Sequence, residues 1–456
     1  MRQKSTILYA AGLLAALLAG IIYLLLADHT PPVIETDLQN ALITPETEIS
    51  VSLSDASPGL RSVKISLGAE SGTITALSAE FSGRPASETI KFSLGRENIR
   101  RLFQNAPVTV ERNDLKLLLT ISATDASMAE FGKGNTGERQ FELTVDLLPP
   151  RAEILACPSQ IQQGRSASLV FRASEPLRGA RLLVGADNEK DEFEGFTSYP
   201  QKNNIYACVF TLPHTAPPES FEPRLVLTDQ AGNVSRIPLN ILGLPARYRE
   251  DRISVSPVFL REKAPEFMRS APGESDALAL FLRVNNEVRK ANYEELRALK
   301  TRTEATPLWQ GVFLRLPNAI KRSEFADRRI YFYLGREVDR QVHQGIDLAS
   351  VLRDKVPAAE NGRVIFAGYL GIHGNAVLLD HGLGVQTLYS HLSRLDVKPG
   401  APVRRGRTLG LTGASGMAGG DHLHFEIFVG GVSVEPDDWL AGAVPWQLIK
   451  TLNDLQ

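Results

Sequence analysis

The chain has 456 residues, of which 43% are hydrophobic and 22% are charged, and its formal net charge is -2 at pH 7. Both fractions are close to the averages of globular proteins, which excludes a disordered chain and a coiled-coil rod. The small net charge gives no electrostatic reason to expect nucleic acid as a partner. At roughly 150 residues per domain, the length predicts about three domains.

A long uncharged segment lies near the N-terminus. Residues 6–27 carry no charged side chain, and a helix of that length crosses about 30 Å of hydrocarbon. Two basic residues precede the segment and Asp28 follows it, so the positive-inside rule makes residues 1–5 a cytoplasmic tail. We therefore predict a single-pass anchor in the inner (cytoplasmic) membrane, with the rest of the chain in the periplasm or extracytoplasmic space.

A cleaved signal peptide is the alternative for this segment. The apolar region of a signal peptide usually has roughly 7–15 residues and ends in a pair of small residues. Here Leu25 stands where the first small residue of the cleavage site is expected. The length and the cleavage position both favour the anchor.

Residues 149–243 repeat features of residues 31–148. Each stretch opens with Pro-Pro and continues with short alternating segments rich in β-formers, separated by turn residues. This pattern predicts two antiparallel β-sandwich domains. Both resemble bacterial immunoglobulin-like modules, whose last hairpin often carries an Asp-x-Ala-Gly-Asn turn such as the one at residues 229–233. The resemblance implies spacers, or docking surfaces for an envelope protein partner.

Two cysteines, Cys157 and Cys208, both lie in the second predicted sandwich. Outside the cytoplasm such a pair is compatible with a disulfide. Two buried thiols are an equally good interpretation, because a sequence does not measure the distance between them.

The pattern changes after residue 243. Apolar residues between 274 and 299 recur mostly at helical spacing, without Pro or Gly, so we predict that residues 244–308 form a short linker with a helix. Short β-like segments return from residue 309 and continue into the histidine-rich C-terminus, which we assign to a last domain at residues 309–445. The predicted fold class is therefore mainly β.

Six of the eight histidines lie between His343 and His424. In an extended strand, side chains i and i+4 share a face, so His343 and Asp347 are expected to converge on one point, with Gly345 leaving that face open. Polar and apolar residues alternate from residue 422 to 428, so His422 and His424 project from one side.

This combination of side chains suits a metal. Zinc takes nitrogen and oxygen ligands in a tetrahedron, and catalytic zinc sites keep three protein ligands and a water. A set of two imidazoles and one carboxylate fits that requirement. A further imidazole, His391, follows another alternating segment.

The motifs His-x-Gly-x-Asp, Tyr-x-His-Leu and His-Leu-His-Phe follow one another in this order. Together they resemble the lysostaphin-type (LytM-like) zinc endopeptidases, which hydrolyse peptide bonds in bacterial cell walls. The resemblance extends from His343 to about residue 439. It implies an antiparallel β domain with a groove across one sheet, and peptide stems of peptidoglycan as the substrate. It also implies that His343, Asp347 and His424 bind Zn²⁺ and that His391 and His422 are catalytic.

Other polar residues near these motifs are given lesser roles. Glu426 shares the metal-facing side of its strand, but we expect no direct chemistry from it because the histidine pair already supplies acid and base. We expect His373 at the surface, with a place in the lining of the groove as the alternative, and His381 in a structural position. Asp421 stands where Pro is common in the family, which affects the shape of the preceding loop rather than metal binding.

Two other functions stay open. The chain could be a catalytically silent regulator or scaffold of other cell-wall hydrolases, or a structural envelope protein that holds zinc. All three ligands and both catalytic histidines are present, which favours the enzyme. A further hypothesis is that residues 300–335 cover the groove in a resting state.

Overall fold

The computed structural model describes residues 12–18, 20, 21, 23, 28–38, 41–104, 114–184, 191–197, 204–442, 444, 448, 450, 451 and 454. Contacts divide the chain into two compact units: residues 1–149 with 230–233, and residues 150–229 with 234–456. Much of the predicted anchor at residues 6–27 lies outside the described residues. In the part that is described, no helix has the length and apolar character needed to span a membrane.

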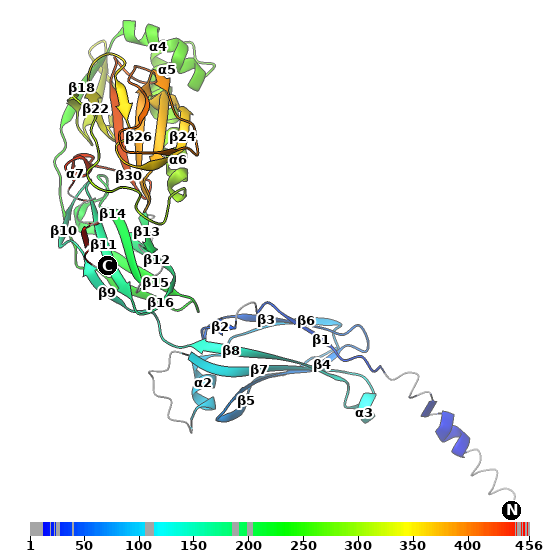
Figure 1. Ribbon diagram of the computed structural model, residues 1–456. Coiled ribbons are helices and arrows are strands. Elements are labelled where there is room, and N and C mark those ends of the chain that lie inside the picture. Colours follow the sequence, from blue (N-terminus) through cyan, green and yellow to red (C-terminus); the bar gives the residue numbers. More distant parts are fainter. Residues whose placement is uncertain are drawn as a thin grey trace, which may run out of the picture. The chain divides into compact units, whose positions relative to one another are not determined.

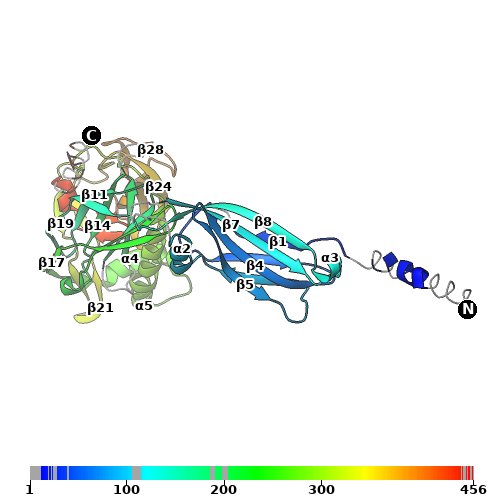
Figure 2. The same ribbon diagram turned by 90° about the horizontal axis from the view of Figure 1, so that it is seen from below.

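The first unit contains two sheets around one hydrophobic core. One sheet has the order β1-β3-β6 and the other β2-β8-β7-β4-β5, with β4, β5, β7 and β8 side by side in Figure 2. The alternation in β7 turns Leu115, Leu117, Leu119 and Ile121 into the core. The elements are β1 (Val33–Thr36), β2 (Leu42–Ile43), β3 (Ile49–Ser54), β4 (Leu60–Ala69), β5 (Gly72–Glu80), β6 (Ser87–Phe92), α2 (Arg96–Leu102), β7 (Asp114–Asp125), α3 (Ala129–Gly132) and β8 (Thr136–Asp146).

The second unit begins with a seven-stranded sheet of order β16-β15-β12-β13-β14-β11-β9. Cys157 is exposed and Cys208 is buried in this region, and the two do not form the disulfide that the sequence left open. The elements are β9 (Ala152–Ala156), β10 (Gln160–Gln162), β11 (Ser166–Ala173), β12 (Leu177–Val184), β13 (Asp191–Thr197), β14 (Ile205–Thr211), η1 (Pro218–Ser220), β15 (Arg224–Asp229), β16 (Val234–Pro238) and β17 (Leu242–Leu244).

Helices follow, as the spacing of apolar residues predicted. They are α4 (Pro257–Ser270), α5 (Ala277–Arg283), a π-helical turn at Val284–Val288 and α6 (Arg289–Ala298). Ser256 and Asp276 cap α4 and α5 by accepting hydrogen bonds from backbone amides of the first turn. The sequence did not predict α4, whose interior contains Pro265, a residue that normally argues against a helix.

The C-terminal part is built on an eight-stranded sheet. Its order is β19-β22-β30-β26-β25-β24-β28, with β31 beside β30, and its pairings are antiparallel. Two three-stranded sheets, β18-β20-β21 and β23-β29-β27, accompany it. The elements are β18 (Glu250–Val255), η3 (Leu299–Thr301), β19 (Ile320–Ser323), β20 (Arg328–Tyr333), β21 (Arg336–Val342), β22 (Ile346–Ala349), β23 (Lys355–Pro357), β24 (Gly362–Tyr369), η4 (Gly371–His373), β25 (Asn375–Asp380), β26 (Val385–Leu392), β27 (Arg394–Leu395), β28 (Pro402–Val403), β29 (Thr408–Leu411), β30 (Leu423–Val429), β31 (Val432–Val434) and α7 (Asp437–Leu440).

The two faces of this sheet have different neighbours. On one face, Phe425 of β30 belongs to the same core as Trp309 and Trp439. On the other face, Phe428 of the same strand packs with Leu296 of α6. Helix α6 therefore lies beside the sheet face that carries the polar side chains of β30 (Figure 1).

The second predicted sandwich joins the C-terminal part in one unit. Trp439 is fully buried and its indole nitrogen donates to Ser166 Oγ at 2.9 Å. Arg165 forms an ion pair with Asp438 at 2.8 Å. The sequence predicts a separate spacer here, whereas the structure gives both parts a continuous hydrophobic core.

The segment 300–335, which we expect to cover the groove, lies partly behind the sheet and partly beside the histidines. Trp309 and Phe313 are buried in the core behind the sheet, where their rings contact that of Trp439. Arg329 is the one residue of this segment, within the described part of the chain, that lines the histidine pocket. Large aromatic side chains gain more by burial in that core than on a polar face.

Candidate metal centre

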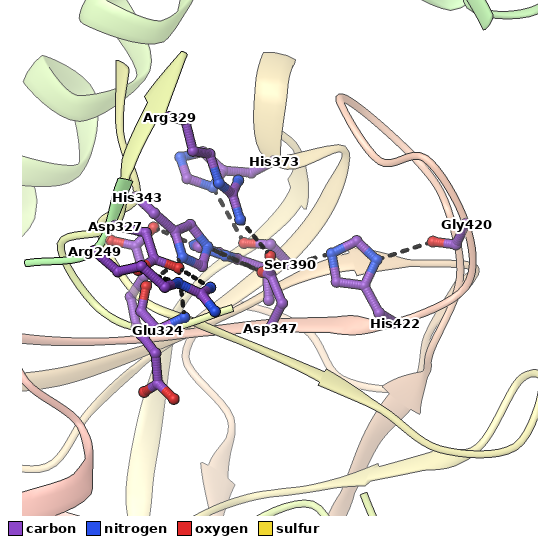
Figure 3. A network of polar contacts seen from close by, with 12 residues as sticks. Arg249, Glu324, Asp327, Arg329, His343, Asp347, His373, Ser390, Gly420 and His422 are labelled. Atoms are coloured by element: carbon purple, nitrogen blue, oxygen red, sulfur yellow. Dashed lines mark hydrogen bonds and ion pairs between the residues drawn. The ribbon is translucent and has the colours of Figure 1, made fainter. Parts of the chain in front are cut away.

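The structure brings His343, Asp347 and His424 together. Figure 3 shows the first two of these side chains with their polar contacts. His343 lies just after β21, and Asp347 of β22 is directly opposite His424 of β30 in the antiparallel pairing. His343 Nε2 is 3.0 Å from Asp347 Oδ1 and 2.9 Å from His424 Nδ1, and the last two atoms are 2.9 Å apart. Three potential ligand atoms from three chain segments therefore surround one point.

The route to this convergence differs from the one predicted. His343 and Asp347 do not share one strand, because the chain bends between β21 and β22. Gly345 sits in that bend, where a Cβ atom would lie 2.3 Å from the carbonyl oxygen of Phe425. Glycine is thus required for close approach to β30 rather than for an open face.

Each of the three side chains is oriented by a second contact. The far nitrogen of His343, Nδ1, lies 2.8 Å from the carbonyl oxygen of Glu324. Asp347 Oδ2 accepts a hydrogen bond from Arg329 Nη2 at 2.6 Å. His424 Nε2 lies 2.6 Å from Glu426 Oε1. Supporting groups of this kind fix the tautomer and direction of metal-binding histidines and carboxylates.

These contacts determine which atoms carry lone pairs. In each neutral imidazole, the nitrogen that carries the proton donates a hydrogen bond to a carbonyl or carboxylate oxygen. The other nitrogen, Nε2 of His343 and Nδ1 of His424, therefore has the lone pair and faces Asp347 Oδ1. Three acceptors about 3 Å apart repel one another unless a cation lies between them. A tetrahedral zinc ion with ligands at roughly 2.0–2.1 Å spaces its ligand atoms by about 3.3 Å, so the donor types and their spacing fit zinc.

Burial of the three side chains strengthens the need for a cation between them. The exposed fractions of His343, Asp347 and His424 are 3%, 7% and 6%. Burial disfavours protonated His424, but hydrogen bonds to Asp347 and Glu426 outweigh it and raise the pKa of His424 to about 9. Burial likewise opposes ionisation of Asp347, yet its contacts with the imidazoles hold the pKa of Asp347 well below the usual range. Without a metal, protons must therefore provide the positive charge.

Two more histidines border the same point. The rings of His391 and His422 are 4.8 Å apart, and the His391 ring is 5.7 Å from that of His424. His391 Nδ1 contacts the Ser415 carbonyl at 2.8 Å, and His422 Nδ1 contacts the Gly420 carbonyl at 2.9 Å. Each carbonyl accepts a hydrogen bond from the protonated Nδ1, so the neutral imidazole has its lone pair on Nε2.

The two imidazoles differ in environment. His391 has a positive φ of 64° and an exposed fraction of 7%. Burial, together with the neighbouring His422 and His424, lowers the pKa of His391 well below its usual value, so this ring is neutral near pH 7. His422 is more exposed, and its Nε2 is 3.6 Å from Asp347 Oδ1.

The remaining polar residues take clear positions. Glu426 is fully buried and contacts the far side of His424, so it supports a ligand. His373 is 2% exposed, which corrects the expected surface position, and burial lowers its pKa to about 3. His381 is buried against Asn361 and Thr387, in the structural role that was expected. Asp421 accepts a hydrogen bond from Thr412 Oγ1 at 2.6 Å and so holds the end of its loop.

A cavity of about 30 Å³ lies beside these side chains. Helix α6 closes it on one side with Arg289 and Tyr293, and Met417 closes it on another.

Sequence reasoning missed several of the supporting residues. Arg329, Glu324 and Tyr293 lie outside the histidine motifs, and their sequence spacing to the ligands has no regular period. Arg329 was detectable only as one of many charged residues. Glu426 was visible from the strand alternation, which places it on the His424 side of β30, although its role as a support was not predicted.

Comparison with known proteins places the C-terminal region in a family. The model of peptidase family M23 matches residues 341–436. Residues 341–436 form a peptidase M23 domain of the LytM/lysostaphin type. M23 peptidases are generally zinc-dependent, and His343, Asp347, His391, His422 and His424 all fall within the matched residues.

Three relatives illustrate the range of this domain. DD-carboxypeptidase/endopeptidase Mpg of Neisseria meningitidis is 41% identical over 96 residues, which are 21% of this chain and 22% of Mpg. Peptidoglycan DD-endopeptidase ShyC of Vibrio cholerae is 35% identical over 126 residues, 27% of this chain and 28% of ShyC. Murein hydrolase activator EnvC of Escherichia coli is 40% identical over 86 residues, 19% of this chain and 20% of EnvC. The matched residues thus cover between 20% and 28% of the length of each relative.

Proposed function

We propose that this chain is a zinc-dependent endopeptidase that hydrolyses peptide cross-links of bacterial peptidoglycan. The observation that carries the proposal is the convergence of three potential ligand atoms, from His343, Asp347 and His424, beside the imidazole pair His391 and His422. The relatives named as peptidoglycan DD-endopeptidase and DD-carboxypeptidase/endopeptidase supply the substrate class.

The chemistry follows from the arrangement. Bound zinc would lower the pKa of a water molecule towards about 7 and polarise the scissile carbonyl. Backbone carbonyls accept hydrogen bonds from Nδ1 of His391 and of His422, so each neutral ring has its lone pair on Nε2, next to the candidate ligands. This pair accepts the proton of the attacking water and returns a proton to the leaving amine.

We also propose that residues 6–27 anchor the chain in the inner membrane, with residues 28–456 on the outer side. The uncharged segment and its basic N-terminal flank support this orientation. It places the catalytic domain in the compartment that holds peptidoglycan. The immunoglobulin-like resemblance of residues 31–148 and 149–243 supports a role for these regions in spacing or in binding an envelope protein.

The proposal is tested with full-length protein in detergent and isolated peptidoglycan. We expect mass spectra of the released fragments to show hydrolysed cross-links with new amine ends. These products should be absent after chelation and in His422→Ala. Restoration of cleavage by zinc after chelation is the internal control. Intact cross-links with zinc-loaded wild-type protein would exclude the endopeptidase.

A second function has one observation in its favour. EnvC, named as a murein hydrolase activator, is 40% identical to this chain over 86 residues. A regulator of other cell-wall hydrolases would leave peptidoglycan intact by itself and increase cleavage by an added hydrolase. The same fragment assay, run with and without a second hydrolase, separates the two functions.

A further inference from the structure

Helix α6 lies outside the residues matched by the M23 family, yet it reaches the metal centre. We propose that Tyr293 of α6 is a positioning residue: its hydroxyl holds the carboxylate of Glu426, and Glu426 holds the ligand His424. This inference rests on the proposed function, because it assigns a role towards the bound zinc.

The contacts form a continuous chain. The Tyr293 hydroxyl donates to Glu426 Oε1 at 2.8 Å, and the same oxygen lies 2.6 Å from His424 Nε2. The other carboxylate oxygen, Oε2, accepts a hydrogen bond from Ser433 Oγ at 3.3 Å. Glu426 is fully buried, so these protein groups replace the water that would otherwise solvate its charge.

Tyr293 is itself held in place by the packing of α6. Its ring meets the ring of His373 edge-on, with centroids 5.3 Å apart. The preceding residue, Asn292, accepts a hydrogen bond from the amide of Ile372 at 2.9 Å. One turn later, Leu296 packs against the sheet beside Phe428. The hydroxyl therefore reaches Glu426 from a fixed direction.

Loss of the hydroxyl would leave Glu426 with a competing partner. His373 offers a ring nitrogen within 4.8 Å of the ligand atoms of Glu426 and His424. Its Nε2 is buried and has no hydrogen-bond partner among the described residues. A carboxylate released by Tyr293 can turn towards His373, and His424 then loses the contact that fixes its tautomer and its angle to the metal. Outer contacts of this kind change metal affinity by roughly 10–100-fold.

The proposal makes α6 part of the metal centre rather than only a cover over it. A cover that merely blocks the substrate would change the access of peptides and leave zinc affinity unaltered. A positioning helix changes zinc affinity itself. The M23 domain at residues 341–436 would then depend on a residue 133 positions away from Glu426 in the sequence.

The test compares the full-length wild type with Tyr293→Phe, which keeps the ring and removes only the hydroxyl. Zinc dissociation constants are measured at neutral pH by competition with a chromophoric chelator, and Co²⁺-loaded protein reports ligand geometry through its visible absorption. We expect at least about 10-fold weaker zinc binding for Tyr293→Phe and an altered cobalt spectrum. Tyr248→Phe is the matched control, because its hydroxyl bonds the carbonyl of Gln163 and not the metal centre.

A double-mutant cycle keeps the test decisive. If Tyr293 acts through Glu426, the variant carrying both Tyr293→Phe and Glu426→Gln binds zinc no more weakly than Glu426→Gln alone. Absence of zinc binding in the wild type would remove the proposed function. If the wild type binds zinc tightly and Tyr293→Phe has the same zinc affinity and the same cobalt spectrum, only the positioning role is overturned. If Tyr293→Phe does not fold, Glu426→Gln is the second test. The same zinc affinity in Glu426→Gln and in the wild type would also overturn the positioning role.

Discussion

Replacing His391 separates catalysis from metal binding. The three ligand side chains take their supporting contacts from Glu324, Arg329 and Glu426, so a change at His391 leaves them in place. A general acid–base group contributes roughly 10²–10⁴-fold, which corresponds to about 3–5 kcal/mol of transition-state stabilisation. We therefore expect kcat to fall by that factor while the zinc dissociation constant changes by less than about threefold.

The structure also selects the replacement. His391 has a φ of 64°, a conformation that Asn accepts more readily than most residues. In His391→Asn the amide group can still donate to the Ser415 carbonyl, which preserves the loop. Activity is measured on a defined cross-linked peptide dimer, and zinc affinity by chelator competition.

His381→Asn is the matched control for this prediction. His381 is fully buried but bonds Asn361 and Thr387, away from the metal centre. We expect lower thermal stability for this variant and unchanged kcat below its melting temperature. If zinc affinity in His391→Asn fell in parallel with kcat, His391 would be part of the metal site and the assignment of roles would be refuted.

Three further outcomes follow from the structure. Asp347→Ala should abolish zinc binding and lower the stability of the metal-free protein by about 3–5 kcal/mol, because Arg329 loses a buried partner; calorimetry with and without zinc measures both effects. Trp439→Ala should cost about 3–5 kcal/mol, because the indole fills the core shared with the second sandwich; urea unfolding checks this value. Burial raises the pKa of Glu435 from 4.5 to about 7, so its contribution to stability is complete below about pH 4.5 and is lost as the pH rises through about 7. In Glu435→Gln that loss should be absent when unfolding at about pH 5 and about pH 8 is compared, and an unchanged pH dependence would contradict the assignment.

The seven-stranded sheet of residues 152–238 and the M23 domain belong to one compact unit, which limits where the chain can be cut into fragments. The fully buried Trp439 bonds Ser166 and its rings contact Trp309 and Phe313. A fragment that begins after residue 243 would expose this core. Spacing of the catalytic domain, as predicted from the sequence, therefore depends on the first unit more than on residues 149–243.

The sequence alone identified the side chains that meet at the candidate metal centre. The alternation in β30 places His424 and Glu426 on one face, because side chains of a strand alternate between its two sides. The order of the three histidine motifs predicted an M23-type domain, and the family match confirmed that prediction. These features are local, so they can be read without knowledge of the fold.

The tertiary structure alone decided how those side chains are supported. Arg329 and Tyr293 contact Asp347 and Glu426, which lie 18 and 133 residues further along the chain. The absence of a disulfide between Cys157 and Cys208 likewise depends on how the strands pack. Such contacts have no sequence period, because they form only when packing fixes both the backbone positions and the side-chain directions. The bend at Gly345 has the same origin: the backbone of β30 approaches too closely there for any side chain.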